Sequence, residues 1–236
     1  MKRLAFKLND TLQVIRLGNT SNDKIESDKK RKIIQTYTFS RKQYELIQSG
    51  AEKSQKIFFG LADTNCLDCP YNSYGKCYTH KFNQYVGFVS MLKSIAKEHG
   101  EFDNIPRYNQ LVKAKAVEMS QDTYVRFGTY GEPSLHPITM ITGMARVSQK
   151  YTGYTHQWAK KDELSKFFMA STHTKSEEMK ASKLGYRSFV ATNTIISDAV
   201  SCPASKEAGY KSSCSKCGLC SGTEGKGDKS VYIFNH

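Results

Sequence analysis

The sequence predicts an α/β protein whose strands run parallel. Segments typical of strands and of helices alternate through most of residues 56–236, and two loops of unusual composition each follow a predicted strand. Such alternation is typical of βαβ units, in which a helix returns the chain so that consecutive strands lie parallel. We expect six such strands, which can form either an open sheet or a partial barrel.

Residues 1–55 are expected to form a basic N-terminal extension. They hold twelve Lys and Arg against six Asp and Glu, including the run DKKRK at 28–32. The segments LAFKL and LQVIRL, separated by Asn9 and Asp10, predict a β-hairpin because polar turn residues divide two apolar runs. A charged linker and a short helix at 41–48 should follow.

Six short segments lack helical periodicity and are bounded by turn residues, as expected of strands. They are KIFFGLA at 56–62, TYVRFG at 123–128, YTGYTH at 151–156, KFFMAS at 166–171, YRSFVAT at 186–192 and SVYIFNH at 230–236. The intervening helices are expected at 78–100, at 108–119, from Pro137 onwards and at 174–184. Apolar residues recur at three- and four-residue steps in the first of these helices, and Thr174 with Glu177 predicts a capping box for the last.

The composition is that of a soluble protein, with 39% hydrophobic and 24% charged residues. No apolar run approaches the roughly 18 to 20 residues that cross a bilayer, and the N-terminus lacks the apolar core of a secretory signal. We therefore predict a cytoplasmic protein with no membrane partner. The net charge of +13 favours contact with nucleic acid through a basic surface, but a solvated basic surface that keeps the protein soluble explains it equally well.

The seven cysteines fall into two groups, separated by a long stretch without cysteine. The first group contains Cys66, Cys69 and Cys77, and the second contains Cys202, Cys214, Cys217 and Cys220. In a cytoplasmic chain, clustered Cys-x2-Cys spacing favours metal or redox chemistry over disulfides. The second group offers four thiolates, which suit either tetrahedral Zn²⁺ or an iron–sulfur cluster, and the spacing does not separate these two.

The first cysteine group has only three thiols. Either His80, three residues beyond Cys77, is a fourth ligand, or one coordination position is left open for a substrate or cofactor. Residues 129–133, Thr-Tyr-Gly-Glu-Pro, directly follow the strand predicted at 123–128. Because the carboxyl ends of parallel strands meet at one edge, this loop and the first cysteines should lie side by side.

These residues resemble the radical SAM superfamily, whose members carry three cysteines after the first strand and a glycine-rich Gly-Glu-Pro motif after the second. The stretch FGTYGEPSLHP is similar to that motif, whereas the spacing C-x2-C-x7-C differs from the common C-x3-C-x2-C. The resemblance implies a partial (β/α)6 barrel over residues 56–200. It also implies a 4Fe–4S cluster on Cys66, Cys69 and Cys77, with S-adenosylmethionine bound at the fourth iron.

The resemblance also implies a set of cofactor-binding residues. They are Tyr78, Thr129, Tyr130, Gly131, Glu132 and Pro133. Glu132 would accept hydrogen bonds from the ammonium of S-adenosylmethionine, Gly131 would allow close approach, and Pro133 would fix the turn. Tyr78 could stack on the adenine or begin the buried face of the following helix.

Residues 201–236 resemble the auxiliary cluster segments of some members, which implies a second 4Fe–4S cluster or Zn²⁺. The small size is similar to that of radical SAM proteins encoded by phages and mobile elements. The implied reaction is reductive cleavage of S-adenosylmethionine to a 5′-deoxyadenosyl radical, which acts on an unknown substrate with an electron from a reducing donor. The alternative is a zinc-stapled, basic nucleic-acid-binding protein without catalysis, which has no need of the Gly-Glu-Pro loop.

Three further residues lie at or just after predicted strand ends. His156, Trp158 and His173 could line a substrate or cofactor pocket, and packing or helix capping explains each of them as well. No catalytic side chain is predicted, because in radical chemistry the cofactor abstracts the hydrogen and the protein supplies geometry and exclusion of water.

Overall fold

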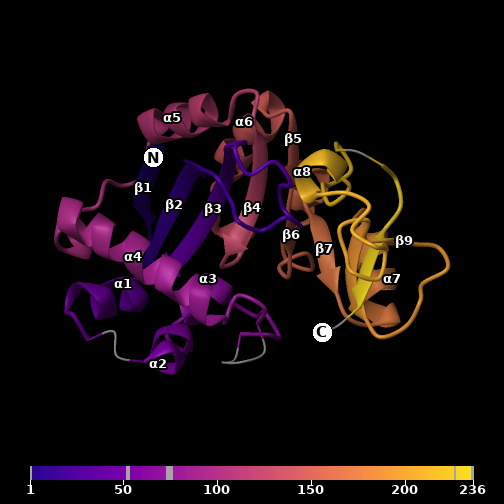
Figure 1. Ribbon diagram of the computed structural model, residues 1–236, viewed down its shortest axis with the longest axis horizontal. Coiled ribbons are helices and arrows are strands. Elements are labelled where there is room, and N and C mark those ends of the chain that lie inside the picture. The colour runs from indigo at the N-terminus through magenta and orange to yellow at the C-terminus, as the bar shows by residue number, and fades with distance from the viewer. Residues whose placement is uncertain (1, 52–53, 73–76, 226, 235–236) are drawn as a thin grey trace.

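Two five-stranded sheets form the centre of the computed structural model, which describes residues 2–51, 54–72, 77–225 and 227–234 (Figure 1). The first sheet contains, in spatial order, β1 (Lys2–Leu8), β2 (Thr11–Gly18), β3 (Ile33–Ser40), β4 (Tyr124–Tyr130) and β5 (Lys150–Thr152). The second contains β6 (Tyr154–Thr155), β7 (Met169–Thr172), β8 (Ser188–Thr192), β10 (Val231–Phe234) and β9 (Val200–Ser201).

Helices connect most of these strands. The α-helices are α1 (Arg41–Gln48), α2 (Gln55–Gly60), α3 (Asp63–Cys66), α4 (Phe82–His99), α5 (Gln110–Ser120), α6 (Ile138–Val147), α7 (Lys175–Lys183) and α8 (Cys214–Cys217). Short 3-10 helices are η1 (Phe102–Asn104), η2 (Pro133–Leu135) and η3 (Asp162–Lys166). The capping box of Thr174 and Glu177 is confirmed at the start of α7, and Gly100 ends α4 with a φ of 71°. Among the described residues, no helix has both the length and the apolar character needed to cross a bilayer.

The predicted α/β class with parallel strands is confirmed. β1 and β2 form an antiparallel hairpin, β2 pairs antiparallel with β3, and from β3 onwards every ladder is parallel. The chain passes from the first sheet to the second at Gly153, which separates β5 from β6. A Cβ atom there would lie 2.7 Å from Cδ1 of Phe168, so only glycine fits this junction. The sheets of the described residues do not close into a barrel.

The strand predicted at 56–62 is wrong, because α2 occupies this segment. The side chain of Ser54 accepts a hydrogen bond from the Ile57 N–H, and Phe58 and Phe59 are both buried. A short apolar run cannot distinguish a strand from a buried helix, since it is too short to show a period. Packing of the two phenylalanines decides the outcome.

The first strand of the parallel series is instead β3, which lies in the segment expected to be a charged linker. Its sequence, IIQTYTFS, is buried throughout. β-Branched and aromatic residues of this kind are a strand signal that the sequence did contain. Residues 1–55 therefore supply β1, β2 and β3 to the sheet that also contains β4 and β5.

The remaining predicted strands are observed with shifted ends. β4, β7 and β8 match the segments predicted at 123–128, 166–171 and 186–192, and the weak strand at 151–156 is divided into β5 and β6. β10 ends at Phe234, and residues 235–236 of the predicted last strand lie outside the described residues.

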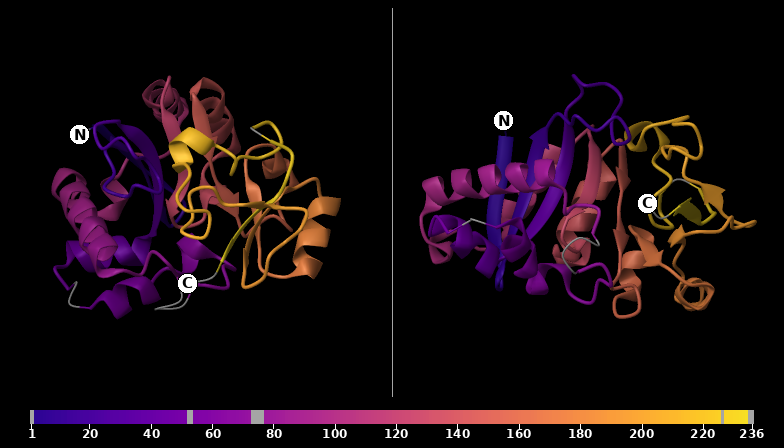
Figure 2. Two further views of the ribbon diagram at one scale, coloured as in Figure 1. Left: turned by 45° about the vertical axis from the view of Figure 1, so that its right-hand side comes forward. Right: turned by 60° about the horizontal axis from the view of Figure 1, so that its bottom comes forward.

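Helices cover the two faces of the sheets unequally. α5, α6 and α7 pack on one face, together with Phe6, Ile34 and Phe127 of the strands. On the opposite face, α1, α2 and α4 cover β1 to β3 through a cluster that includes Tyr37 and Phe39. We call this second face the inner face. From β4 onwards it carries the cysteine-bearing segments. The C-terminal segment lies against the strands of the second sheet in both views of Figure 2.

Candidate functional site

A pocket of about 500 Å³, here called the first cysteine pocket, lies at the carboxyl end of β4. The residues that line it are Cys66, Cys69, Cys77, Tyr78, Thr79, Gly128, Thr129, Tyr130, Gly131, Glu132, Pro133, Tyr154 and His156. All three cysteines of the first group and all six proposed cofactor-binding residues therefore share one pocket.

Backbone contacts hold the cysteine loop against the sheet, although helices α1 to α3 separate it from β3 in the chain. The Asn65 side-chain amide donates to the Thr38 carbonyl at 2.9 Å, and the Asn65 carbonyl accepts from the Glu132 N–H at 2.7 Å. Gly131 has a φ of 76°, and a Cβ there would lie 2.6 Å from the Thr38 carbonyl oxygen. Gly131 is thus needed because three backbone segments meet at this point.

Glu132 is 3% exposed, and protein donors already engage its carboxylate. Oε1 accepts from the Thr155 hydroxyl at 2.5 Å and from the Ser134 N–H at 3.2 Å, and Oε2 accepts from the His156 N–H at 3.1 Å. Burial raises the pKa of this carboxyl group, and the donors partly offset that rise. A carboxylate offers about four acceptor positions, so one on Oε2 remains for a ligand. Glu132 also ties the loop after β4 to β6.

The two tyrosines of the predicted site differ in their surroundings. The Tyr130 ring packs against Phe39 and Phe88, and its hydroxyl accepts from the Gln43 amide at 2.7 Å, so most of this side chain belongs to the core. Tyr78 is 49% exposed, and its hydroxyl accepts a hydrogen bond from Nη2 of Arg126 at 3.0 Å. Tyr78 is therefore the tyrosine of this pair that a ligand can reach.

Two histidines from different strand ends meet beside the first cysteines. Nε2 of His156 lies 4.0 Å from Sγ of Cys69 and 3.3 Å from Nε2 of His173, whose Nδ1 lies 3.2 Å from the Tyr71 hydroxyl. Burial, and then the neighbouring His173, lower the pKa of His156 to about 4, so this ring is neutral near pH 7. The histidine that lines the pocket is His156, whereas the His80 ring stacks on Phe59 with centroids 4.0 Å apart.

Trp158 has a structural role. Its side chain is buried, and its indole N–H donates to the Ser171 carbonyl at 3.2 Å. Packing, one of the two interpretations left open by the sequence, therefore accounts for this residue.

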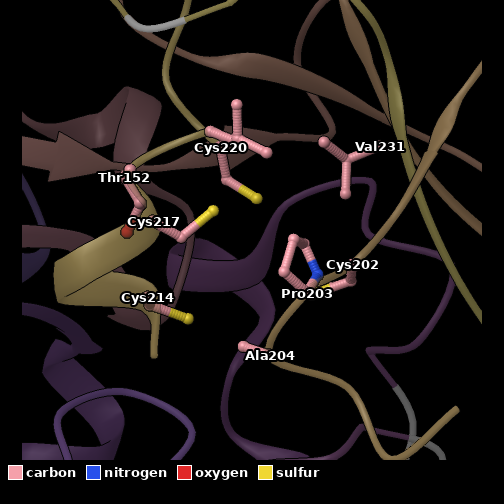
Figure 3. Close-up of a pocket in the computed structure, with 10 residues that line it drawn as sticks. Thr152, Cys202, Pro203, Ala204, Cys214, Cys217, Cys220 and Val231 are labelled. Atoms are coloured by element: carbon pink, nitrogen blue, oxygen red, sulfur yellow. The ribbon is translucent and has the colours of Figure 1, made fainter. Parts of the chain in front are cut away.

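The second cysteine group lines a separate pocket of about 260 Å³, here called the second cysteine pocket. Cys214 and Cys217 belong to α8, Cys220 follows this helix, and Cys202 lies across the pocket beside Pro203 (Figure 3). Most of the other lining residues are apolar or small. This pocket is smaller than the first cysteine pocket, which suits a closed site filled by its own ligands.

Main-chain hydrogen bonds fasten the second cysteine pocket to the rest of the fold. The Cys214 N–H donates to the Lys24 carbonyl at 2.8 Å, the Cys220 carbonyl accepts from Gly153 at 2.7 Å, and the Cys202 N–H donates to Tyr232 at 2.9 Å. One pocket is thereby connected to the N-terminal half, to the junction of the two sheets and to the last strand.

The thiols of each group influence one another. Burial, and then Cys69 and Cys77, raise the pKa of Cys66, while burial raises the pKa of Cys69 to about 11. In the second group, burial raises the pKa of Cys214 to about 11 and that of Cys220 well above its ordinary value. Buried neighbouring thiols resist ionisation together unless a cation compensates their charge, so both donor sets suit a metal centre.

Among the described residues, no three His, Cys, Asp or Glu side chains are arranged closely enough to hold a single metal ion. The two metal sites, and the choice of Zn²⁺ or an iron–sulfur cluster for the second, stay predictions.

Comparison of the chain with family models, with curated proteins and with solved structures finds no match.

Three residues of the site were not anticipated from the sequence. Asn65 and Thr155 act through hydrogen bonds between segments far apart in the chain, which no local pattern reveals. Arg126 did leave a signal, because a lone cation interrupts the otherwise uncharged strand TYVRFG.

Proposed function

We propose that this protein is a radical SAM-type iron–sulfur enzyme. The observation that carries the proposal is the first cysteine pocket, in which three thiols and the Gly-Glu-Pro loop face one another across the ends of parallel strands. Three thiolates leave one position of a 4Fe–4S cluster without a protein ligand, and the pocket beside them is lined by groups that can bind a small molecule, such as Glu132 and the Tyr78 ring.

The order of the strands supports the finer proposal of a partial barrel. The segments β3, β4, β5 with β6, β7, β8 and β10 follow one another in space in the order of the chain, and their ladders are parallel. This gives six parallel strand positions with helices α5, α6 and α7 on the outer face and both cysteine pockets on the inner face.

Each residue of the first pocket has a proposed role. Cys66, Cys69 and Cys77 hold the cluster. Glu132 orients the ammonium of S-adenosylmethionine through the free position on Oε2. If Cys66, Cys69 and Cys77 hold such a cluster, it would supply, after reduction by an external donor, one electron for the reductive cleavage of S-adenosylmethionine. Glu132 itself is 3% exposed, which keeps its carboxylate fixed beside that position.

The second cysteine pocket is proposed to hold an auxiliary 4Fe–4S cluster or Zn²⁺ on Cys202, Cys214, Cys217 and Cys220. Its four thiols satisfy either centre without an external ligand. Its main-chain ties to three parts of the fold give the bound centre a structural role as well.

The test is anaerobic purification followed by measurement of iron, sulfide and zinc and by an assay for 5′-deoxyadenosine with a chemical reductant. We expect a brown protein that forms 5′-deoxyadenosine from S-adenosylmethionine, and a Cys77→Ala variant that keeps the second centre but forms none. A colourless protein that contains zinc in both pockets and forms no 5′-deoxyadenosine would overturn the proposal.

One observation favours the alternative, a zinc-stapled nucleic-acid-binding protein. The basic loop before β3 hydrogen-bonds to α8 through the Lys24 and Ile25 carbonyls, and it carries four consecutive exposed cations at 29–32. A metal on α8 would therefore order a basic surface. If this is the function, replacing Lys30 and Lys32 by Glu should weaken binding to a single-stranded oligonucleotide. The slope of log binding constant against log salt concentration should also become less steep, by the amount expected for the loss of about two phosphate contacts.

A further inference from the structure

Arg126 lies on the inner face of the sheet between the two cysteine pockets. Side chains alternate along a strand, so Tyr124, Arg126 and Gly128 of β4 share this face. Tyr124 packs in a cluster with Cys214 of the second pocket, and Gly128 lines the first pocket. Arg126 is midway between them.

The neighbouring strand segment shows the same order. Thr152, the register partner of Arg126, lines the second cysteine pocket, whereas Tyr154 and His156 line the first. Thr152 and Tyr154 lie on either side of Gly153, so the two pockets are adjacent along the inner face. Arg126 and Tyr154 form the layer at their boundary, where Tyr154 also stacks on Phe189 with centroids 4.6 Å apart.

The Arg126 guanidinium has little to balance its charge. Within the described part of the chain its hydrogen-bond partner is the Tyr78 hydroxyl, at 3.0 Å, and no carboxylate lies within salt-bridge distance. Burial lowers the pKa of Arg126, but the nearby groups of Tyr78, Tyr154, Tyr124 and Cys214 together raise it by more, so the group stays charged. Four of its five N–H donors are left for other acceptors.

Arg187 provides a contrast on the same side of the protein. Its guanidinium donates to the main-chain carbonyls of Lys229, Ser221 and Leu219 at 3.0 to 3.1 Å, and so holds the C-terminal segment in place. Arg187 has a structural role, in which Nε and both terminal nitrogens of its guanidinium donate to main-chain carbonyls. Arg126 is half-buried and lacks such carbonyl partners among the described residues.

We propose that Arg126, with the hydroxyl groups of Tyr78 and Tyr154, binds the carboxylate or phosphate group of an anionic substrate at the boundary of the two cysteine pockets. The planar fork of a guanidinium matches both groups, and the tyrosine hydroxyls beside it offer further donor capacity on one side. The inference rests on the proposed function only in taking the anion to be the substrate of that enzyme.

The anion site is tested on the unmodified, anaerobically purified protein by reaction with phenylglyoxal, which modifies accessible arginines, followed by mass spectrometry of the peptides. Inorganic phosphate and succinate are the two probes, because they separate recognition of a phosphate from recognition of a carboxylate. We expect at least one of them to protect Arg126, while exposed Arg107 and Arg146 react regardless of the probe. Arg126 that reacts equally with and without both probes would overturn the proposal, as would protection by S-adenosylmethionine but by neither probe.

Two variants extend the test to binding. Arg126→Gln should weaken the binding of the protecting probe by about 10-fold or more, and Arg126→Lys should weaken it less, because the charge remains while the fork is lost. Metal content should be unchanged in both variants. Loss of metal from the second pocket in Arg126→Gln, with probe affinity retained, would show that Arg126 serves as a counter-charge for Cys214 instead. None of these measurements uses cleavage of S-adenosylmethionine, so failure of the proposed function is detected separately.

Discussion

The two cysteine pockets differ in what surrounds the thiols. The first contains three thiols among polar groups such as Glu132 and His156, and its volume is about 500 Å³. The second contains four thiols among mostly apolar or small residues, in about 260 Å³. An incomplete donor set in a roomy polar pocket suits chemistry on a bound molecule, whereas a complete set in a small pocket suits a structural or auxiliary centre.

The pockets also differ in how the fold holds them. Main-chain hydrogen bonds connect the second pocket to the basic loop, to the sheet junction at Gly153 and to β10. The first is held through α3 and Asn65 and through side-chain contacts such as that of Tyr71 with His173, and residues 73–76 of its loop lie outside the described residues. In Figure 1 α3 and α8 lie toward opposite ends of the strands, with Arg126 between the two pockets. Removing a cysteine of the second pocket should therefore mainly lower stability, and removing a cysteine of the first pocket should mainly abolish function.

The largest effect is expected when a ligand of the second pocket is removed. Cys217→Ala should lower the free energy of unfolding by about 3 to 5 kcal/mol, because the binding energy of the metal centre proposed for this pocket would also be folding energy. Urea unfolding of the anaerobic protein, with metal content measured alongside, checks this. The matched change in the first pocket, Cys77→Ala, should cost less than about 1 kcal/mol of stability yet abolish formation of 5′-deoxyadenosine. Equal destabilisation by the two variants would contradict the conclusion that the second pocket contributes more to stability than the first.

Replacing Glu132 tests the role proposed for this residue in the first pocket. Glu132→Ala removes the acceptor for Thr155, Ser134 and His156, and we expect it to weaken S-adenosylmethionine binding and to lower stability, each by about 1.5 to 3 kcal/mol. Calorimetric titration and urea unfolding measure the two quantities, with exposed Glu118→Ala as the control. Iron at the first pocket should be retained. Normal cofactor binding in Glu132→Ala would show that this loop has been assigned the wrong chemistry.

Stability should fall as the pH is lowered, because of a buried histidine just beyond the Gly-Glu-Pro loop. His136 is 3% exposed, and burial lowers its pKa from 6.5 to about 3. Below pH 6.5 the unfolded chain binds a proton that the folded protein does not, so this residue alone should reduce the unfolding free energy by about 2 kcal/mol between pH 7 and pH 5.

Urea unfolding at the two pH values checks this prediction. His136→Gln should remove that part of the pH dependence and leave the part due to His156, whose pKa is lowered to about 4. A slope unchanged by the substitution would mean that His136 is accessible to protons in the folded protein.

The smallest effect concerns the anchor of the cysteine loop. Asn65→Ala loses the hydrogen bond to the Thr38 carbonyl and leaves that buried acceptor unsatisfied, so it should cost about 1 to 2 kcal/mol of stability. The loss should be accompanied by weaker iron binding at the first pocket and unchanged metal at the second. Asn72→Ala, which loses a 3.3 Å hydrogen bond to Ala62 in the same loop, is the control for general loosening.

The candidate site was more predictable than the boundaries of the fold. Both cysteine groups and the Gly-Glu-Pro loop were visible because thiols and glycine–proline turns have local signatures. The first cysteines do lie beside Glu132, but the strand expected to bring them there is helix α2. The first parallel strand was assigned to 56–62 instead of β3, since a short apolar run has no period to distinguish strand from helix. The hairpin, α1, α4 and the capping box of α7 were correct, because turn residues, apolar periodicity and caps are local signals.

The sequence by itself determined the chemistry available to this protein: two sets of thiols, one carboxylate in a constrained turn, and strands of parallel type. These follow from residue identity and from neighbours within a few positions. Only the tertiary structure decided that Asn65 joins α3 to β3, that Glu132 is held by Thr155 and His156, and that Arg126 stands between the two pockets. Such contacts depend on the register of strands far apart in the chain, and register is fixed by the packing of whole sheets and helices rather than by any local run of residues.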